Sequence, residues 1–133
     1  MRLVRQAIQT PDGTILESRH RHDYVTHKDA VTGETYMVDG GLEYTRGIVN
    51  KVPAKDMSVC LEDGIEAVRE AVQWGTRGKS GNEPYRLVTL SEMSNNHIQA
   101  CIDTQPTMHP HYREAFLMEL SYRRNNGITI EDI

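Results

Sequence analysis

Residues 3–18 have the sequence LVRQAIQTPDGTILES, in which two apolar segments surround a turn signal. The turn signal is Pro11-Asp12-Gly13-Thr14, since proline presets φ for a turn and glycine accepts positive φ. Residues 3–8 fit a first strand, and residues 14–18 fit a second strand that returns beside it. The chain is therefore expected to begin with an antiparallel β-hairpin.

A second hairpin is expected directly after the first. Residues 24–26 and 35–38 are rich in β-branched and aromatic side chains, and they flank a loop at 29–33 that ends in glycine. Asp39-Gly40-Gly41 then breaks the strand. Residues 42–52 are expected to supply another extended segment.

The remaining chain favours helices. Asp63 begins a capping-box pattern, and we expect its helix to end at Gly75. Ser94 is expected to cap a second helix. Pro110 suits the first turn of a last helix, and Gly127 suits the position just past its end.

Strands followed by helices predict an α+β fold, with an N-terminal antiparallel β-sheet and then about three helices. We expect residues 1–133 to form a single domain, mainly β over 1–60 and mainly helical over 61–133. A chain of this size buries roughly two thirds of its unfolded surface, so it can hold a modest core. Its hydrophobic fraction of 38% is low, which suggests that another subunit completes part of the apolar surface.

Composition excludes several classes of protein. No apolar run reaches the roughly 18 residues that a membrane-spanning helix needs, and the N-terminus lacks the apolar stretch of a signal peptide. Cys60 and Cys101 lie far apart and have no zinc-site spacing, which suits a reducing cytosol. The net charge of −4 disfavours binding to a nucleic acid polymer.

The polar loop at residues 75–84 is the most informative feature for chemistry. Gly78-Lys79-Ser80 matches the end of a nucleotide phosphate-binding loop, but Gln73 stands where the first glycine of that motif belongs. The motif also follows a strand, whereas this loop is expected to follow a helix. Nucleoside triphosphate hydrolysis is therefore not expected.

The same loop carries side chains that suit a phosphorylated ligand. Arg77 and Lys79 can bind phosphate, and the flanking Trp74 and Tyr85 can stack a base. The alternative interpretation is a plain connection from helix to strand, with Trp74 in the core.

Histidines form a second cluster at His20, His22 and His27, together with Asp23. In a strand, His20 and His22 point to one face, and neutral imidazoles at that spacing can bind a metal. No fixed third ligand is evident from the spacing. These residues are therefore interpreted as polar hairpin residues or as ligand contacts, and no metal site is predicted.

Two helix segments offer further ligand contacts. Asn95, Asn96 and His97 suit helix capping, yet an amide can also bind an adenine edge, and a helix N-terminus favours an anion. Arg113 and the Tyr122-Arg123 pair lie on the last helix, where cations also complement the helix dipole.

Catalytic signatures are missing from the sequence. It contains no Gly-x-Ser-x-Gly, no HExxH and no EF-hand pattern, and neither cysteine lies beside several cations. Their absence favours a binding protein over an enzyme, and no cofactor is predicted.

The combined pattern resembles a known family. Residues 20–25 and 38–46 resemble the N-terminal half, and residues 74–79, 90–97 and 119–123 the C-terminal half, of the phage Thoeris anti-defence sponges, the first anti-Thoeris family described. The resemblance covers most of the chain. Some similar sequences carry cysteine pairs around the second hairpin, and this chain has none there.

The resemblance implies a function. Such proteins sequester a host immune signal, a cyclic ADP-ribose isomer, without cleaving it, in the cytoplasm of the infected bacterium. Some members also hold cyclic di- or trinucleotides at a second site. Members form homodimers, which can assemble into hexamers.

Residue chemistry and the resemblance together predict one main ligand site of cationic, aromatic and amide side chains. Its members are Trp74, Arg77, Lys79, Tyr85, Asn95, Asn96, His97, Arg113, Tyr122 and Arg123. His20, His22 and Arg46 lie in the N-terminal match and form the second predicted site. Two alternatives stay open: a phosphodiesterase or glycohydrolase that cleaves such nucleotides, and an accessory module that binds a protein.

Overall fold

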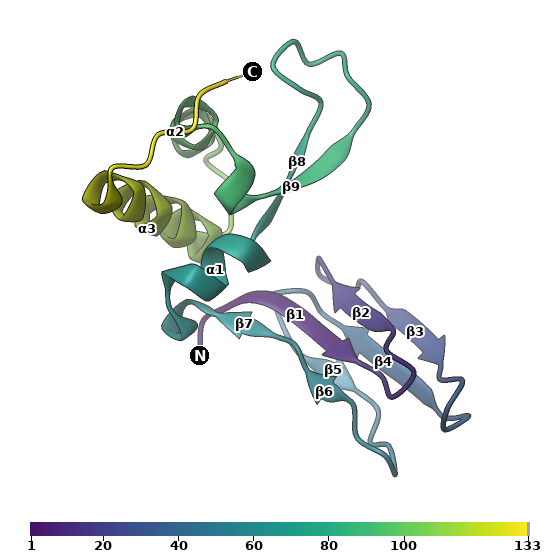
Figure 1. Ribbon diagram of the computed structural model, residues 1–133. Helices are drawn as coiled ribbons and strands as arrows, with labels where there is room; N and C mark the ends of the chain where they lie inside the picture. Colours follow the sequence, from purple (N-terminus) through teal and green to yellow (C-terminus); the bar gives the residue numbers. More distant parts are fainter. Residues whose placement is uncertain (133) are drawn as a thin grey trace. The chain divides into compact units, whose positions relative to one another are not determined.

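A computed structural model describes residues 1–132 as two compact units. The β unit is Leu3–Cys60, and the helical unit is Met1–Arg2 together with residues 61–132. Antiparallel strands are mostly N-terminal and three helices follow toward the C-terminus, so the predicted α+β class is confirmed (Figure 1). The boundary between the units falls where the sequence changes from strand-rich to helix-rich, and the single domain stays a prediction.

The first predicted hairpin opens the β unit. Strand β1 (Leu3–Gln9) pairs antiparallel with β2 (Ile15–Ser18), and Gly13 in the turn between them has a φ of 92°. Two short strands, β6 (Lys55–Asp56) and β7 (Val59–Cys60), also pair with β1. This hairpin prediction is confirmed.

The second predicted hairpin forms a separate sheet. Strands β3 (Val25–Lys28) and β4 (Thr35–Asp39) are antiparallel, and the two-residue β5 (Arg46–Gly47) extends the sheet. The extended segment expected over 42–52 is wrong apart from β5. The chain turns at once, because the Gly40 carbonyl accepts hydrogen bonds from the N–H groups of Glu43 and Tyr44.

An apolar cluster joins the two sheets of the β unit. Leu16 of β2 packs with Tyr36 and Val38 of β4, and partly buried Ile8 and Val25 pack against them. These side chains come from alternate positions of their strands, as expected where one sheet face is buried.

The helical unit begins with α1 (Ile65–Ala71) and continues into a two-stranded hairpin of β8 (Gln73–Thr76) and β9 (Arg86–Thr89). Helices α2 (Asn95–Thr104) and α3 (Pro110–Asn126) follow. No helix in the stretch from residue 1 to 132 combines the length and apolar character that crossing a membrane requires.

Both later helices begin where the sequence predicts, and α3 also ends there. Ser94 Oγ accepts a hydrogen bond from the N–H of His97 at the start of α2. Pro110 occupies the first turn of α3, and Gly127 ends that helix with a left-handed φ of 64°. His109 caps α3 by accepting from the N–H of His111.

The expected end of the first helix at Gly75 is wrong. Helix α1 ends at Ala71, and Val72 is already extended, with its carbonyl accepting from the N–H of Leu90. Gly64, with a φ of 95°, precedes α1, and no side chain caps it, so the capping box expected at Asp63 is absent there. The loop of interest thus follows strand β8. It is followed by another strand rather than by the helix of a phosphate-binding loop, so that motif remains excluded.

A buried ion network joins the elements of the helical unit. Glu119 of α3 is 0% exposed, and both of its carboxylate oxygens accept hydrogen bonds from Arg69 of α1, at 2.8 and 2.9 Å. Arg123, 1% exposed, donates to Glu119 at 2.7 Å, to Asn95 Oδ1 at 2.8 Å and to the Leu90 carbonyl. One carboxylate therefore positions α1, α3 and, through Arg123, the start of α2.

Replacing Glu119 should destabilise the helical unit strongly. Glu119→Ala leaves the Arg123 guanidinium buried without its counter-charge, for which a loss of about 3–5 kcal/mol is typical. Urea unfolding followed by circular dichroism measures this loss. The control is Glu114→Ala, whose carboxylate on the same helix pairs with Arg2 at the surface and should matter little. Equal unfolding midpoints for the two variants would contradict the role of the network.

Candidate functional site

The β8–β9 hairpin presents an aromatic ring and a guanidinium together. Arg77 lies 5.7 Å from the centre of the Tyr85 ring, and Tyr85 is 60% exposed. The ring lies over Gly75, where an added Cβ would come within 2.3 Å of the Tyr85 hydroxyl. Gly75 therefore lets the ring approach the backbone, and the pair forms an accessible surface for a planar group.

A carboxylate links the tip of this hairpin to the start of α2. Lys79 Nζ lies 3.8 Å from Asp132 Oδ2, and the hydroxyl of Ser94 donates a hydrogen bond to the same carboxylate. The Asn96 side chain also acts on this carboxylate and lowers its pKa. The Ser94 bond, and then those from Asn96 and Lys79, lower the pKa of Asp132 against the opposing effect of burial. We call Lys79, Ser94, Asn96 and Asp132 the α2 anion cluster.

His97 lies in the first turn of α2, next to this cluster. Burial lowers the pKa of its imidazole, and the Asp132 carboxylate opposes this only in part. The neutral imidazole is therefore favoured near neutral pH, where it can accept or donate a hydrogen bond without adding charge.

Trp74 has a packing role. Its ring meets Phe116 of α3 edge-on at 5.3 Å and Tyr112 at 6.5 Å, and it is partly buried. Within the hairpin, Tyr85 rather than Trp74 is the more accessible ring, so the core interpretation of Trp74 fits its surroundings better.

Four other predicted ligand residues lie outside the hairpin and the α2 anion cluster. Arg123 and Asn95 are held in the buried ion network, so their polar atoms serve the fold. Arg113 donates to the carbonyls of Ile102 and Gln105 at the opposite end of α2, and Tyr122 lies under the Arg69 guanidinium at 4.8 Å. These groups have the right charge and shape for a ligand, but tertiary contacts engage them elsewhere.

The second predicted site contains a hydrogen-bond chain. His22 Nδ1 lies 2.9 Å from the hydroxyl of Tyr44, which donates to buried Asp39 at 3.3 Å. Arg46 stands opposite Asp39 in the register of β4 and β5. His22 has a φ of 63°, a conformation that only a few non-glycine residues adopt.

His20 joins this region through its backbone. A Cβ on Gly41 would come within 2.6 Å of backbone atoms of His20, so glycine allows the two turns to touch. The three residues of the second site thus lie around one pair of turns, while their binding to a cyclic oligonucleotide stays a prediction.

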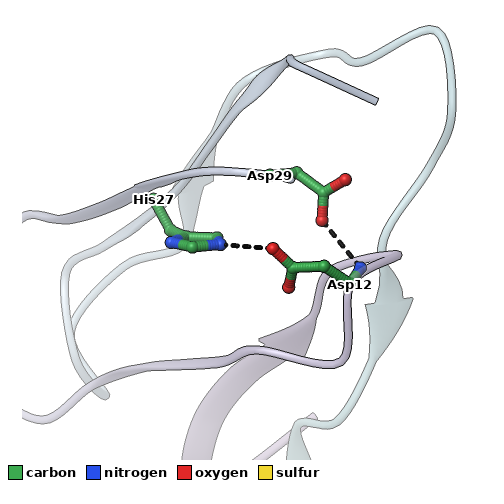
Figure 2. A group of neighbouring side chains, drawn as sticks. All are labelled: Asp12, His27 and Asp29. Carbon is green, nitrogen blue, oxygen red and sulfur yellow. Dashed lines mark hydrogen bonds and ion pairs between the residues drawn. The ribbon is translucent and has the colours of Figure 1, made fainter. Parts of the chain in front are cut away.

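Sequence analysis missed a group formed by Asp12, His27 and Asp29, shown in Figure 2. His27 Nε2 lies 2.8 Å from Asp12 Oδ2, and Asp29 accepts from the N–H of Asp12 at 2.8 Å. Asp12 sits in the turn after β1, His27 lies in β3, and Asp29 directly follows β3. One atom of each residue lies within 4.8 Å of the others, so a metal ion has to be considered.

Hydrogen-bond donors already engage these carboxylates. The N–H groups of Ala30 and Thr14, and then His27, lower the pKa of Asp12 far below its ordinary value. Burial tends to raise the pKa of Asp29, but donors that include the backbone N–H groups of Thr32 and Asp12 lower it overall. A cation would displace these donors, so we assign the group to clamping two turns together.

Neither protein-family models, nor curated proteins, nor solved structures gave a match.

The turn clamp should make the β unit sensitive to acid. Because the pKa values of Asp12 and Asp29 are lower in the folded state, the unfolded chain takes up protons first as the pH falls. Their contribution is fully present above the unfolded value of about 3.9 and is lost progressively below it. Urea unfolding at pH 6 and pH 3 measures this loss.

Asp12→Asn should be less stable at pH 6 and should lose less stability between pH 6 and pH 3 than the unmodified protein. Asp103→Asn, on the exposed side of α2, is the control and should keep the original pH dependence. A midpoint that rises on adding Zn²⁺ or Mn²⁺, and no longer does so in His27→Gln, would contradict the clamp assignment.

Proposed function

We propose that this protein binds a cyclic ADP-ribose isomer and sequesters it without cleaving it. In this proposal it is a phage protein that acts in the cytoplasm of an infected bacterium, where removal of the signal keeps the host effector silent. We further propose that it works as a homodimer, able to form a hexamer, as in the family that it resembles.

The α2 anion cluster is the observation that carries the proposal. Beside the start of α2, a hydroxyl donates a hydrogen bond to the Asp132 carboxylate, an ammonium lies 3.8 Å from it, and the Asn96 amide lowers its pKa. The same donors suit a phosphate oxygen, because a helix N-terminus and a nearby cation both favour negative charge. A cyclic ADP-ribose isomer carries two phosphates close together.

The β8–β9 hairpin can contact the adenine part of such a ligand. Tyr85 is exposed and Arg77 lies over its ring, so the pair can stack an adenine and neutralise phosphate. Both groups belong to the hairpin that carries Lys79. Base and phosphate contacts therefore come from one hairpin loop and one helix start.

Binding without cleavage fits the chemistry around Ser94. Its hydroxyl donates to Asp132 and accepts from the N–H of His97, so it acts as a helix cap rather than as a nucleophile paired with an imidazole. Burial raises the pKa of the Cys101 thiol, which disfavours the reactive thiolate.

Recovery of the ligand tests sequestration against catalysis. The protein is incubated with an equimolar cyclic ADP-ribose isomer, heated to release it, and the supernatant is analysed by liquid chromatography and mass spectrometry. We expect quantitative recovery of intact ligand. Turnover at a tenth of the ligand concentration would establish an enzyme, and no thermal shift with any cyclic nucleotide would favour a protein-binding module.

Removing the hairpin guanidinium should weaken binding with the fold preserved. Arg77→Ala loses a charge-assisted hydrogen bond and the cation over Tyr85, so we expect the Kd to rise roughly tenfold or more by calorimetry. Arg124→Ala, an exposed arginine near the end of α3, is the matched control and should bind normally. Equal affinities for the two variants would remove Arg77 from the site.

A further inference from the structure

The segment that follows α3, which we call the strap, is hydrogen-bonded to the start of α2. The N–H of Ile128 donates to the Arg123 carbonyl, and Ile130 exchanges two hydrogen bonds with Asn95: its N–H donates to Asn95 Oδ1, and its carbonyl accepts from the N–H of Asn95. Because Arg123 holds Asn95 from the other side, this strap is anchored to the buried ion network.

Asp132 lies two residues beyond that anchor and reaches the α2 anion cluster. The first turn of α2 contains no acidic residue of its own, so the Asp132 carboxylate supplies the negative charge that a helix start favours. Its contacts come from two separate elements: Lys79 from the hairpin, and Ser94 and Asn96 from the helix start.

The contact between Lys79 and Asp132 has the features of one that a ligand can displace. The Lys79 side chain is 77% exposed and Asp132 is 28% exposed, and their charged atoms are 3.8 Å apart. The strap itself is held at Ile130, so the Asp132 side chain can rotate away without breaking the backbone bonds that anchor the segment.

We propose that Asp132 is an internal competitor for the ligand phosphate, an autoinhibitory carboxylate that fills the phosphate subsite until ligand arrives. The phosphate displaces it and takes over Lys79, Ser94 and Asn96. The inference rests on the proposed function for the place of the ligand. It adds that the affinity for the ligand is set by exchange of the Asp132 carboxylate for the ligand phosphate.

Competition favours phosphate for a physical reason. A phosphate presents more acceptor oxygens than a carboxylate, and its bonds to ammonium and amide donors are charge-assisted. The internal carboxylate still lowers the observed affinity, because the ligand must first displace it. Removing its charge should therefore tighten binding of any small anion that uses the same donors.

The test compares Asp132→Asn with Glu131→Gln, which removes the same charge one residue earlier. Inorganic pyrophosphate is the probe, and its Kd is measured from amide NMR shifts of Asn96 and His97. We expect Asp132→Asn to bind pyrophosphate roughly three- to fivefold more tightly than Glu131→Gln, as loss of one partly exposed ion pair suggests. Adding Lys79→Ala should abolish most of that gain.

Two outcomes would overturn the inference. Equal pyrophosphate affinities for Asp132→Asn and Glu131→Gln would mean that only net charge matters. Weaker binding by Asp132→Asn would mean that the carboxylate builds the site rather than blocks it. If Asp132→Asn unfolds, Asp132→Ala replaces it, with the urea midpoint as the check on folding.

A parallel titration with a cyclic ADP-ribose isomer separates this inference from the proposed function. Tighter pyrophosphate binding by Asp132→Asn supports the internal competitor, whatever the nucleotide does. Failure of the nucleotide to bind any variant, alongside that gain, overturns the nucleotide sponge alone. Equal pyrophosphate affinities for Asp132→Asn and Glu131→Gln, alongside a nucleotide that binds the unmodified protein, overturn the competitor alone.

Discussion

The buried carboxylate of Glu119 is the interaction on which the helical unit depends. Removing a charge from water is costly, and here two guanidinium groups compensate it with three hydrogen bonds. Arg123 then extends the network to Asn95, and Asn95 holds the strap at Ile130. The position of the α2 anion cluster follows from this chain of contacts, since each link fixes the next.

In the β unit, backbone N–H donors compensate the removal of carboxylates from water. Asp12 and Asp29 lie in turns, and N–H groups of neighbouring residues satisfy their carboxylates in place of arginine. Three potential metal ligands consequently meet at one place for a structural reason. A carboxylate that already accepts several hydrogen bonds is a poor starting point for a cation site, because each donor has to be displaced.

The candidate ligand site combines elements that the fold positions with side chains that can exchange partners. The hairpin and the start of α2 are positioned by backbone pairing and by the buried network, which limits the ordering that a ligand must impose. Lys79 and Asp132, by contrast, are side chains at a partly exposed surface. The proposed sponge would benefit from this combination, since high affinity requires preorganisation while release of the proposed internal anion would open the subsite.

The sequence by itself determined the two N-terminal hairpins, the caps of α2 and α3, and the α+β order, because turn and cap residues act over a few positions of the chain. It did not determine that α1 stops at Ala71, since the pairing of β8 with β9 depends on residues ten to sixteen positions away. Nor did it separate Arg77, which stays accessible beside Tyr85, from Arg123, which is buried against Glu119. The two arginines have the same chemistry, and only the tertiary structure decides whether a guanidinium meets solvent or a buried carboxylate.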